Sequence, residues 1–173
     1  MCAEPGRLYS SRGSTQRQDM FVGGTIFADI SSRYISVHHQ VSLAASDTIH
    51  SKIKFEQEAF HSGVQITKYH TDNGVFKSHA FLEELAKHKQ EINNSGSGTP
   101  HQNGFAERGI GIVQNMAHTM MIHAAMQQPA GTVTAALWPM AMDYACWLYN
   151  NIPQQDSGFT LLELWSRSTF QAT

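Results

Sequence analysis

The alternation of hydrophobic and polar positions predicts short strands in the first half of the chain. Two β-rich runs, 21–29 and 34–41, are separated by Ile-Ser-Ser-Arg, a spacing that favours an antiparallel hairpin. A third run at 64–70 stops at an Asp-Asn-Gly turn signal at 72–74, and a weak strand is predicted at 91–94. We expect the first three runs to share one sheet.

Apolar residues that recur every three or four positions predict helices after the hairpin and through the second half of the chain. Ser46 is expected to cap the first helix, which Gly63 ends, and Ser78 is expected to cap a second helix that runs to about residue 90. Strands followed by strand-helix units that end in helices indicate an α/β fold with a mixed sheet. From the first to the fourth helix, the buried faces are predicted at Ile49, Ile53 and Phe60; Phe81, Leu82 and Leu85; Ala106, Ile110, Val113, Ala117, Met120 and Ala124; and Leu137, Met140 or Ala141, Tyr144, Leu148 and Ile152.

Length and composition fit one folded domain. The 173 residues are 41% hydrophobic and only 15% charged, which indicates a packed core rather than a disordered chain. Residues 1–19 carry no hydrophobic period and are predicted to be loop or tail, which leaves 20–173 as the domain. The Gly/Ser/Pro-rich stretch at 95–104 is predicted to be a loop before the long third helix.

Charge and cysteine content exclude several kinds of protein. The net charge of −2 gives no bulk attraction to nucleic acid or an anionic membrane, so local groups or metal ions would have to bind any polyanion. The cysteines, Cys2 and Cys146, lack the spacing of zinc ligands, so no zinc is expected. No run reaches the roughly 18 apolar residues of a membrane-spanning helix. We therefore expect an intracellular protein without a membrane partner.

Two carboxylates stand where side chains project from a scaffold. Asp72 follows directly on a predicted strand, and Glu107 lies near the start of the third helix, with Asn103 one turn earlier. Carboxylates from separate elements can together hold Mg²⁺ or Mn²⁺ for phosphoryl transfer. On spacing alone a simpler interpretation is favoured, in which Asp72 makes a turn and Glu107 is a first-turn helix carboxylate.

The sequence motifs around these carboxylates favour the functional interpretation over the structural one. YHTDNG at 69–74 and HQNGFAER at 101–108 resemble motifs of the integrase core of retroviruses and retrotransposons. In that family, motifs of this kind contain the second and third acids of an Asp, Asp, Glu set. The resemblance covers about residues 20–165. Further stretches are similar to the copia-type retrotransposon branch: IFADISSRYISVHHQVSL at 26–43, SGSGTPHQNGFAERGI at 95–110 and LWPMAMDYACWLYNNIP at 137–153.

The resemblance implies a function as well as a fold. The fold would be ribonuclease H-like, and the activity a Mg²⁺- or Mn²⁺-dependent polynucleotidyl transfer that joins element DNA ends to target DNA. Asp72 and Glu107 would be the catalytic metal ligands, and Asn103, Arg108 and His101 would contact nucleic acid. His70 and His101 flank this pair and are candidate phosphate contacts. A working copy would act in the nucleus, and a homodimer formed through helices is a further implied partner.

The first acid of the family's set has no clear counterpart. In the family it comes from a strand just before the run at 21–29, whereas residues 1–19 offer only Glu4 and Asp19, without a convincing strand. Asp29 is expected to be a strand-end turn residue, not a ligand. We therefore expect a core whose first strand is missing, truncated at its N-terminus and impaired in activity.

Basic residues that copia-type sequences place on the long helix are also missing. Gly111 and His118 stand at these positions, and only Arg108 remains near Glu107. Because contacts from Arg and Lys to phosphates dominate nonspecific DNA affinity, weakened binding is expected. The alternative function is therefore a non-enzymatic relic of a transposable element: a nucleic-acid-binding or oligomerising module that has lost turnover.

Overall fold

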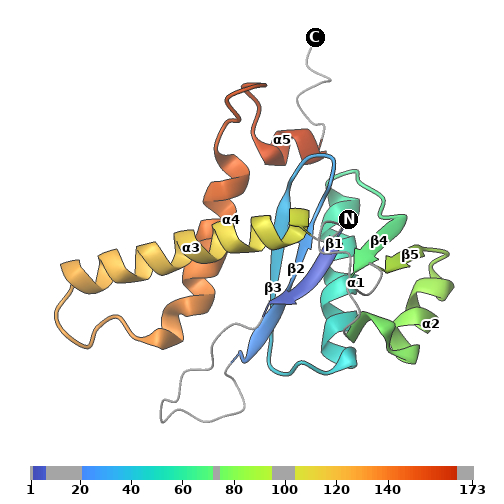
Figure 1. Cartoon of the computed structure of the whole chain (residues 1–173), viewed down its shortest axis with the longest axis horizontal. Coiled ribbons are helices and arrows are strands. Elements are labelled where there is room, and N and C mark those ends of the chain that lie inside the picture. Colours follow the sequence, from blue (N-terminus) through green and yellow to red (C-terminus); the bar gives the residue numbers. More distant parts are fainter. Residues whose placement is uncertain (1, 7–20, 72–74, 95–103, 167–173) are drawn as a thin grey trace.

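The structure is a computed structural model that describes residues 2–6, 21–71, 75–94 and 104–166. Its centre is a five-stranded sheet in the order β3-β2-β1-β4-β5 (Figure 1). β2 pairs antiparallel with β1 and β3, whereas β4 pairs parallel with β1 and β5, so the sheet is mixed as predicted. The strands are β1 (Cys2–Gly6), β2 (Gly23–Ala28), β3 (Ile35–Gln40), β4 (Lys68–Thr71) and β5 (Glu91–Asn94).

Helices cover both faces of the sheet. On one face, Phe27 and Tyr69 belong to a core cluster that includes side chains of α1 and α2. On the other face, Ile26 and Ala28 pack with side chains of α3 and α4, and Figure 1 shows α3 crossing the sheet there. None of the described helices is long and apolar enough to cross a membrane. The helices are α1 (Ala45–His61), α2 (His79–Lys87), α3 (Gly104–Gln127), α4 (Trp138–Asn151) and α5 (Leu161–Ser166), with 3₁₀ turns η1 (Val75–Lys77) and η3 (Ala135–Leu137).

The central strand corrects the interpretation of the N-terminal region. β1 covers Cys2–Gly6, inside the stretch predicted to be loop or tail, so the prediction of a missing first strand is wrong. It pairs along its whole length with β2 but only through Cys2 and Ala3 with β4. The strand could not be predicted from the sequence because Cys2–Gly6 contains no β-branched or aromatic residue, and because Pro5 has no N–H to donate to a neighbouring strand. Residues 7–20 lie outside the described part of the chain.

The hairpin, α2 and α3 form where the pattern predicts them, although Leu82, expected on the buried face of α2, is 39% exposed. α1 differs in its start and its buried face. It begins at Ala45, so Ser46 lies inside the helix instead of capping it. Phe60 was expected on the buried face, but it is 77% exposed, and Phe55 and Ala59 are buried in its place. Gly63, at φ +74°, follows the end of the helix as predicted, since glycine adopts the left-handed conformation without strain.

α4 buries a different face from the predicted one. Tyr144 and Ile152, expected in the core, are exposed. The reason is polar: the Asn150 side chain bonds both backbone groups of Ile35 on the outer edge of β3, accepting from the N–H at 3.0 Å and donating to the carbonyl at 2.6 Å. Backbone groups that a helix covers need partners, so this requirement fixes the rotation of α4. The buried residues are Met142, Ala145, Cys146 and Asn150.

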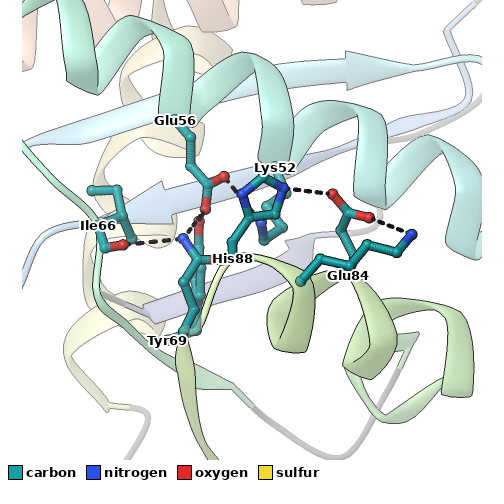
Figure 2. Close-up of polar contacts among 8 residues, drawn as sticks. Lys52, Glu56, Ile66, Tyr69, Glu84 and His88 are labelled. Carbon is teal, nitrogen blue, oxygen red and sulfur yellow. Dashed lines mark hydrogen bonds and ion pairs between the residues drawn. The ribbon is translucent and has the colours of Figure 1, made fainter.

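A buried polar cluster joins α1 to β4 and to the start of β5 (Figure 2). The Glu56 carboxylate accepts hydrogen bonds from the Lys52 ammonium at 3.0 Å, from the Tyr69 hydroxyl and from the Gln90 amide. The Lys52 side chain is 0% exposed and that of Glu56 only 17%. A buried charge needs a partner, so Glu56 compensates Lys52 and ties three elements together.

His38 is a second buried titratable group, on the α1 side of the sheet. Its ring lies against Phe27 and Phe55, and its Nε2 atom is 3.1 Å from the Ser36 hydroxyl. Glu58 lies 3.6 Å away, but that carboxylate is 48% exposed and its charge is screened by solvent. Burial therefore dominates and lowers the pKa of His38 to about 4.

We expect this burial to make stability depend on pH. The unfolded state takes up a proton near pH 6.5 and the folded state only near pH 4, so His38 contributes fully above pH 6.5 and loses its contribution as the pH falls toward 4. The loss should approach about 3 kcal/mol. Urea unfolding at several pH values between 7 and 4 measures the free energy of unfolding, which should change less with pH for His38→Gln than for the wild type. His79→Gln, at an exposed position, should keep the pH dependence of the wild type. The same pH dependence in all three proteins would contradict the attribution of the effect to His38.

Candidate functional site

The first candidate carboxylate follows the carboxyl end of β4. β4 ends at Thr71 and Asp72 follows it directly in the sequence, although Asp72 itself lies outside the described residues. Tyr69 packs in the cluster on the α1 side of the sheet. Because side chains alternate along a strand, His70 faces the opposite side, where α3 lies.

The register of β1 adds a carboxylate that sequence reasoning could not place. Cys2 pairs with His70 and Ala3 with Thr71 in the parallel ladder, and Glu4 follows Ala3 just as Asp72 follows Thr71. In the antiparallel ladder Glu4 pairs with Ile26, a residue of the face that α3 covers. No pattern in the sequence pointed to Glu4, because only the pairing of β1 with β2 and β4 reveals this position.

Glu107 lies in the first turn of α3. Its neighbour Ala106 and the next-turn residue Ile110 are buried, whereas Glu107 and Arg108 are exposed. A carboxylate in the first turn is favoured by the helix dipole. The carboxylate of Glu107 and the guanidinium of Arg108 are therefore both accessible to solvent at the start of α3.

Three of the predicted residues cannot be placed: Asn103 and His101, like Asp72, lie outside the described residues. The expected approach of Asp72 and Glu107 therefore stays a prediction. Within the described ranges, no three His, Cys, Asp or Glu side chains gather into a group that could hold a metal ion. A cation site built on Glu107 would thus have to recruit Asp72 or Glu4.

Asp29 is a turn residue, as expected. Its carboxylate accepts hydrogen bonds of 2.7 Å from both the backbone N–H and the hydroxyl of Ser32. Arg33 closes the same turn with φ +65°, and its N–H donates to the Asp29 carbonyl at 2.8 Å. β2 runs antiparallel to β1, which is parallel to β4, so β2 enters this turn in the direction opposite to that of β4.

One observation fits a bound group beside β4. The Nε2 atom of His70 is buried and has no hydrogen-bond partner within the described part of the chain. A buried polar atom of this kind normally has a partner, so an unpaired one in a candidate site is compatible with a ligand. Carboxylate oxygens from Glu107 and Asp72 are the donors that Mg²⁺ and Mn²⁺ prefer, so the residue types suit such a cation.

Comparisons with solved structures identify the fold. A chain from the simian T-cell lymphotropic virus intasome in complex with PP2A regulatory subunit B56 gamma superposes with a TM-score of 0.71 at 17% identity, over 95% of this chain and 52% of that one. The HTLV-2 integrase catalytic core in complex with magnesium, in its trimeric form, gives 0.66 at 18% identity over 94% and 92%. The catalytic core of BIV integrase gives 0.68 at 13% identity over 98% and 94%.

These likenesses define a class of fold. The chain has the ribonuclease H-like architecture of a retroviral integrase catalytic core, with the mixed sheet and flanking helices in place. It spans about half the length of the intasome chain and nearly the whole of the two isolated cores. No protein-family model matches the sequence, and no curated protein matches it significantly.

Proposed function

We propose that this chain is an integrase-type polynucleotidyl transferase core, of the copia-type retrotransposon branch, that joins element DNA ends to target DNA. The observation that carries the proposal is the fold, shared with integrase cores over more than nine tenths of the chain. The motifs around Asp72 and Glu107 support it, because Asp72 follows β4 directly in the sequence and Glu107 lies in the first turn of α3. For a working copy, the nucleus is the place of action.

Three carboxylates make up the proposed site. Asp72 and Glu107 hold the divalent cation, and Glu4, at its register position in β1, takes the place of the family's first acid. Mg²⁺ or Mn²⁺ would supply the charge that stabilises attacking and leaving oxygens at phosphorus. The HTLV-2 core was solved with magnesium, which supports this choice. Asn103, Arg108 and His101 would contact the DNA backbone, Arg108 through its exposed guanidinium.

A strand-transfer assay with the 173-residue chain tests the function. A short DNA end and a target duplex are incubated with Mg²⁺ or Mn²⁺, and joined products are resolved on a gel. Cation-dependent joining is the expected result. DNA binding without joining in either metal would favour the non-enzymatic relic instead, because that module retains the fold without turnover.

Gly111 offers a direct test of the DNA-binding face of α3. It lies one turn beyond Glu107, and a Cβ atom added there would meet nothing within 4 Å, so a longer side chain fits without strain. Gly111→Lys should raise affinity for a short duplex and steepen its dependence on log salt by about one, because one more phosphate is neutralised. Gly111→Ala supplies the helix propensity without the charge and should leave the salt slope unchanged. Fluorescence anisotropy at several salt concentrations measures both.

A homodimer through the outer face of α4 is part of the proposal. Met140, Tyr144 and Trp147 are 68%, 55% and 57% exposed there, and the two aromatic rings stack with centroids 6.0 Å apart. Asp143 is the single charged residue of α4, so two copies of this face can meet without cationic repulsion. The HTLV-2 core is described in dimeric and trimeric forms, which supports an oligomer.

Trp147→Glu should shift the protein from dimer to monomer. The substitution would bury a carboxylate at the centre of the proposed apolar interface, where aromatic side chains dominate binding energy. Light scattering coupled to size-exclusion chromatography measures the mass. Met126→Glu changes an apolar residue at the end of α3 that is 78% exposed, more than Trp147, and should leave the dimer intact. A monomeric wild-type protein at high concentration would contradict this interface.

A further inference from the structure

A pocket of about 240 Å³ lies between α4 and the outer edge of β3. Asp143 and Trp147 line it from the helix, and Ile35 and Val37 line it from the strand. Asp143 is the only charged residue among those that line the pocket in the described part of the chain, and its side chain is 60% exposed. A pocket whose one charge is negative and whose wall carries an aromatic ring suits a cation.

The strand edge at this pocket already has hydrogen-bond partners. The Asn150 side chain bonds the N–H and the carbonyl of Ile35 at 3.0 and 2.6 Å, and the Cys146 thiol donates to the same carbonyl at 3.0 Å. A peptide that adds a strand to a sheet edge needs such backbone groups to be free. The pocket is therefore suited to a side chain rather than to an added strand.

Asp143 has room for a second partner. Its Oδ1 atom lies 2.7 Å from Nε2 of His39, whereas its Oδ2 atom has no hydrogen bond within the described ranges. An ionised carboxylate accepts several hydrogen bonds. Trp147 follows one turn later on α4 and is 57% exposed. An arginine guanidinium can bond such a carboxylate and also stack on such a ring.

Arg33 is an exposed arginine near the C-terminal end of α4. It stands in the β2–β3 turn, two residues before Ile35, which Asn150 bonds near the end of this helix (Figure 1). Burial raises the pKa of the Tyr149 hydroxyl, and the positive charge of Arg33 opposes that rise. Within the described part of the chain, the Arg33 guanidinium forms no ion pair and no hydrogen bond. Its charge is therefore available to a partner.

The other cations of the described chain lie elsewhere or are already paired. Lys54 belongs to α1, and Lys77 and Lys89 flank α2, so all three lie with the helices that cover the opposite face of the sheet. Arg108 lies in the first turn of α3, within the proposed DNA-binding surface. Carboxylates hold the remaining three, Lys52, Lys68 and Lys87. Arg33 is thus the described cation that a second copy would bring to the outer side of α4.

We propose that two copies of α4 pack antiparallel about Trp147, so that Arg33 of each copy enters the pocket of the other and pairs with Asp143. The inference rests on the proposed function, because it needs the homodimer through the outer face of α4. Such an interface is isologous, so both contacts form at once.

Charge selects the antiparallel arrangement. In a parallel pair the two Asp143 carboxylates would face each other and repel. In an antiparallel pair centred on Trp147 they are separated by about 12 Å along the helices, and residue 151 of one copy lies opposite residue 143 of the other. This brings the end of α4, with Arg33 beside it, to the partner's carboxylate.

The test exchanges the two charges in separate full-length chains. Arg33→Asp and Asp143→Arg each place two like-charge contacts in the dimer, so each should raise its dissociation constant by about 10-fold or more. Mixing the two variants pairs the new carboxylate of one chain with the new guanidinium of the other. Light scattering coupled to size-exclusion chromatography measures the mass of each variant alone and of the equimolar mixture.

The expected result is two monomeric variants that form a heterodimer when mixed. A change within one chain cannot produce this rescue, because each chain keeps its own substitution in the mixture. Asp143→Asn keeps a hydrogen-bonding group toward His39 and removes only the charge, so it should weaken the dimer even if the arginine disturbs α4. The matched control is Lys87→Asp, a charge reversal at a side chain that is 70% exposed on α2, which should stay dimeric.

Two failures can be told apart. If the wild type is a dimer and Arg33→Asp or Asp143→Asn dimerises equally well, the homodimer stands and the Arg33–Asp143 contact is refuted. The contact is also refuted if the two charge-reversal variants stay monomeric when mixed. A wild-type protein that is monomeric at high concentration would instead refute the homodimer of the proposed function.

Discussion

Asp72→Asn and Glu107→Gln should each reduce DNA strand transfer by roughly a thousandfold or more. Each substitution keeps the shape of the side chain and removes a negative charge that the cation needs. Losing such positioning and charge stabilisation commonly raises the barrier by several kcal/mol. The measurement is the yield of joined DNA with time in Mg²⁺. The control is Glu83→Gln, an exposed carboxylate on α2, which should join DNA at the wild-type rate.

Glu4→Gln extends this experiment to the third carboxylate. Its register position in β1 predicts a loss comparable to that of Asp72→Asn, whereas Asp29→Asn should retain activity because that carboxylate already caps a turn. A fully active Glu4→Gln protein would show that Glu4 is not a ligand. Activity lost in Asp19→Asn instead would move the first acid to the region outside the described residues.

Glu56→Gln should lower the free energy of unfolding by about 3–5 kcal/mol, the typical effect of breaking a buried ion pair. The reason is that Lys52 is fully buried and keeps no compensating carboxylate once Glu56 is neutral. The double variant Lys52→Met/Glu56→Gln should recover much of the loss, because it removes the uncompensated charge as well. Urea unfolding at pH 7 measures all three proteins.

Glu84→Gln is the matched control for this experiment. Glu84 also pairs with cationic partners, Lys87 and His88, but these side chains are 70% and 53% exposed (Figure 2). Water can replace the pairing, so the loss should stay within about 1 kcal/mol. A loss for Glu84→Gln as large as that for Glu56→Gln would contradict burial as the cause.

Elements with strong local signals were predictable from the sequence. The hairpin of β2 and β3, the Ser78 cap of α2 and the buried stripe of α3 at Ala106, Ile110 and Val113 all form where the pattern places them. In each case the information lies within a few neighbouring residues: a turn between two β-rich runs, a hydroxyl that accepts from Phe81 N–H, or an apolar period of one helix. The integrase-like fold was also readable, through motifs rather than through packing.

Features that depend on distant partners were not predictable. β1 is a strand because β2 and β4 pair with it, and no property of Cys-Ala-Glu-Pro-Gly favours that conformation. α4 carries two possible apolar faces, and the one turned inward is chosen by Asn150, which satisfies the backbone of Ile35 across the chain.

The sequence by itself thus determined the class of fold, the order of most elements and the pair Asp72 and Glu107 as candidates. The tertiary structure alone decided that Glu4 lies in a central strand and that Lys52 is buried against Glu56. It alone also revealed the unpaired nitrogen of His70. The physical reason is the range of the interactions. Propensity, capping and period act between neighbours in the chain, whereas strand register, desolvation and hydrogen-bond satisfaction depend on residues that meet only after folding.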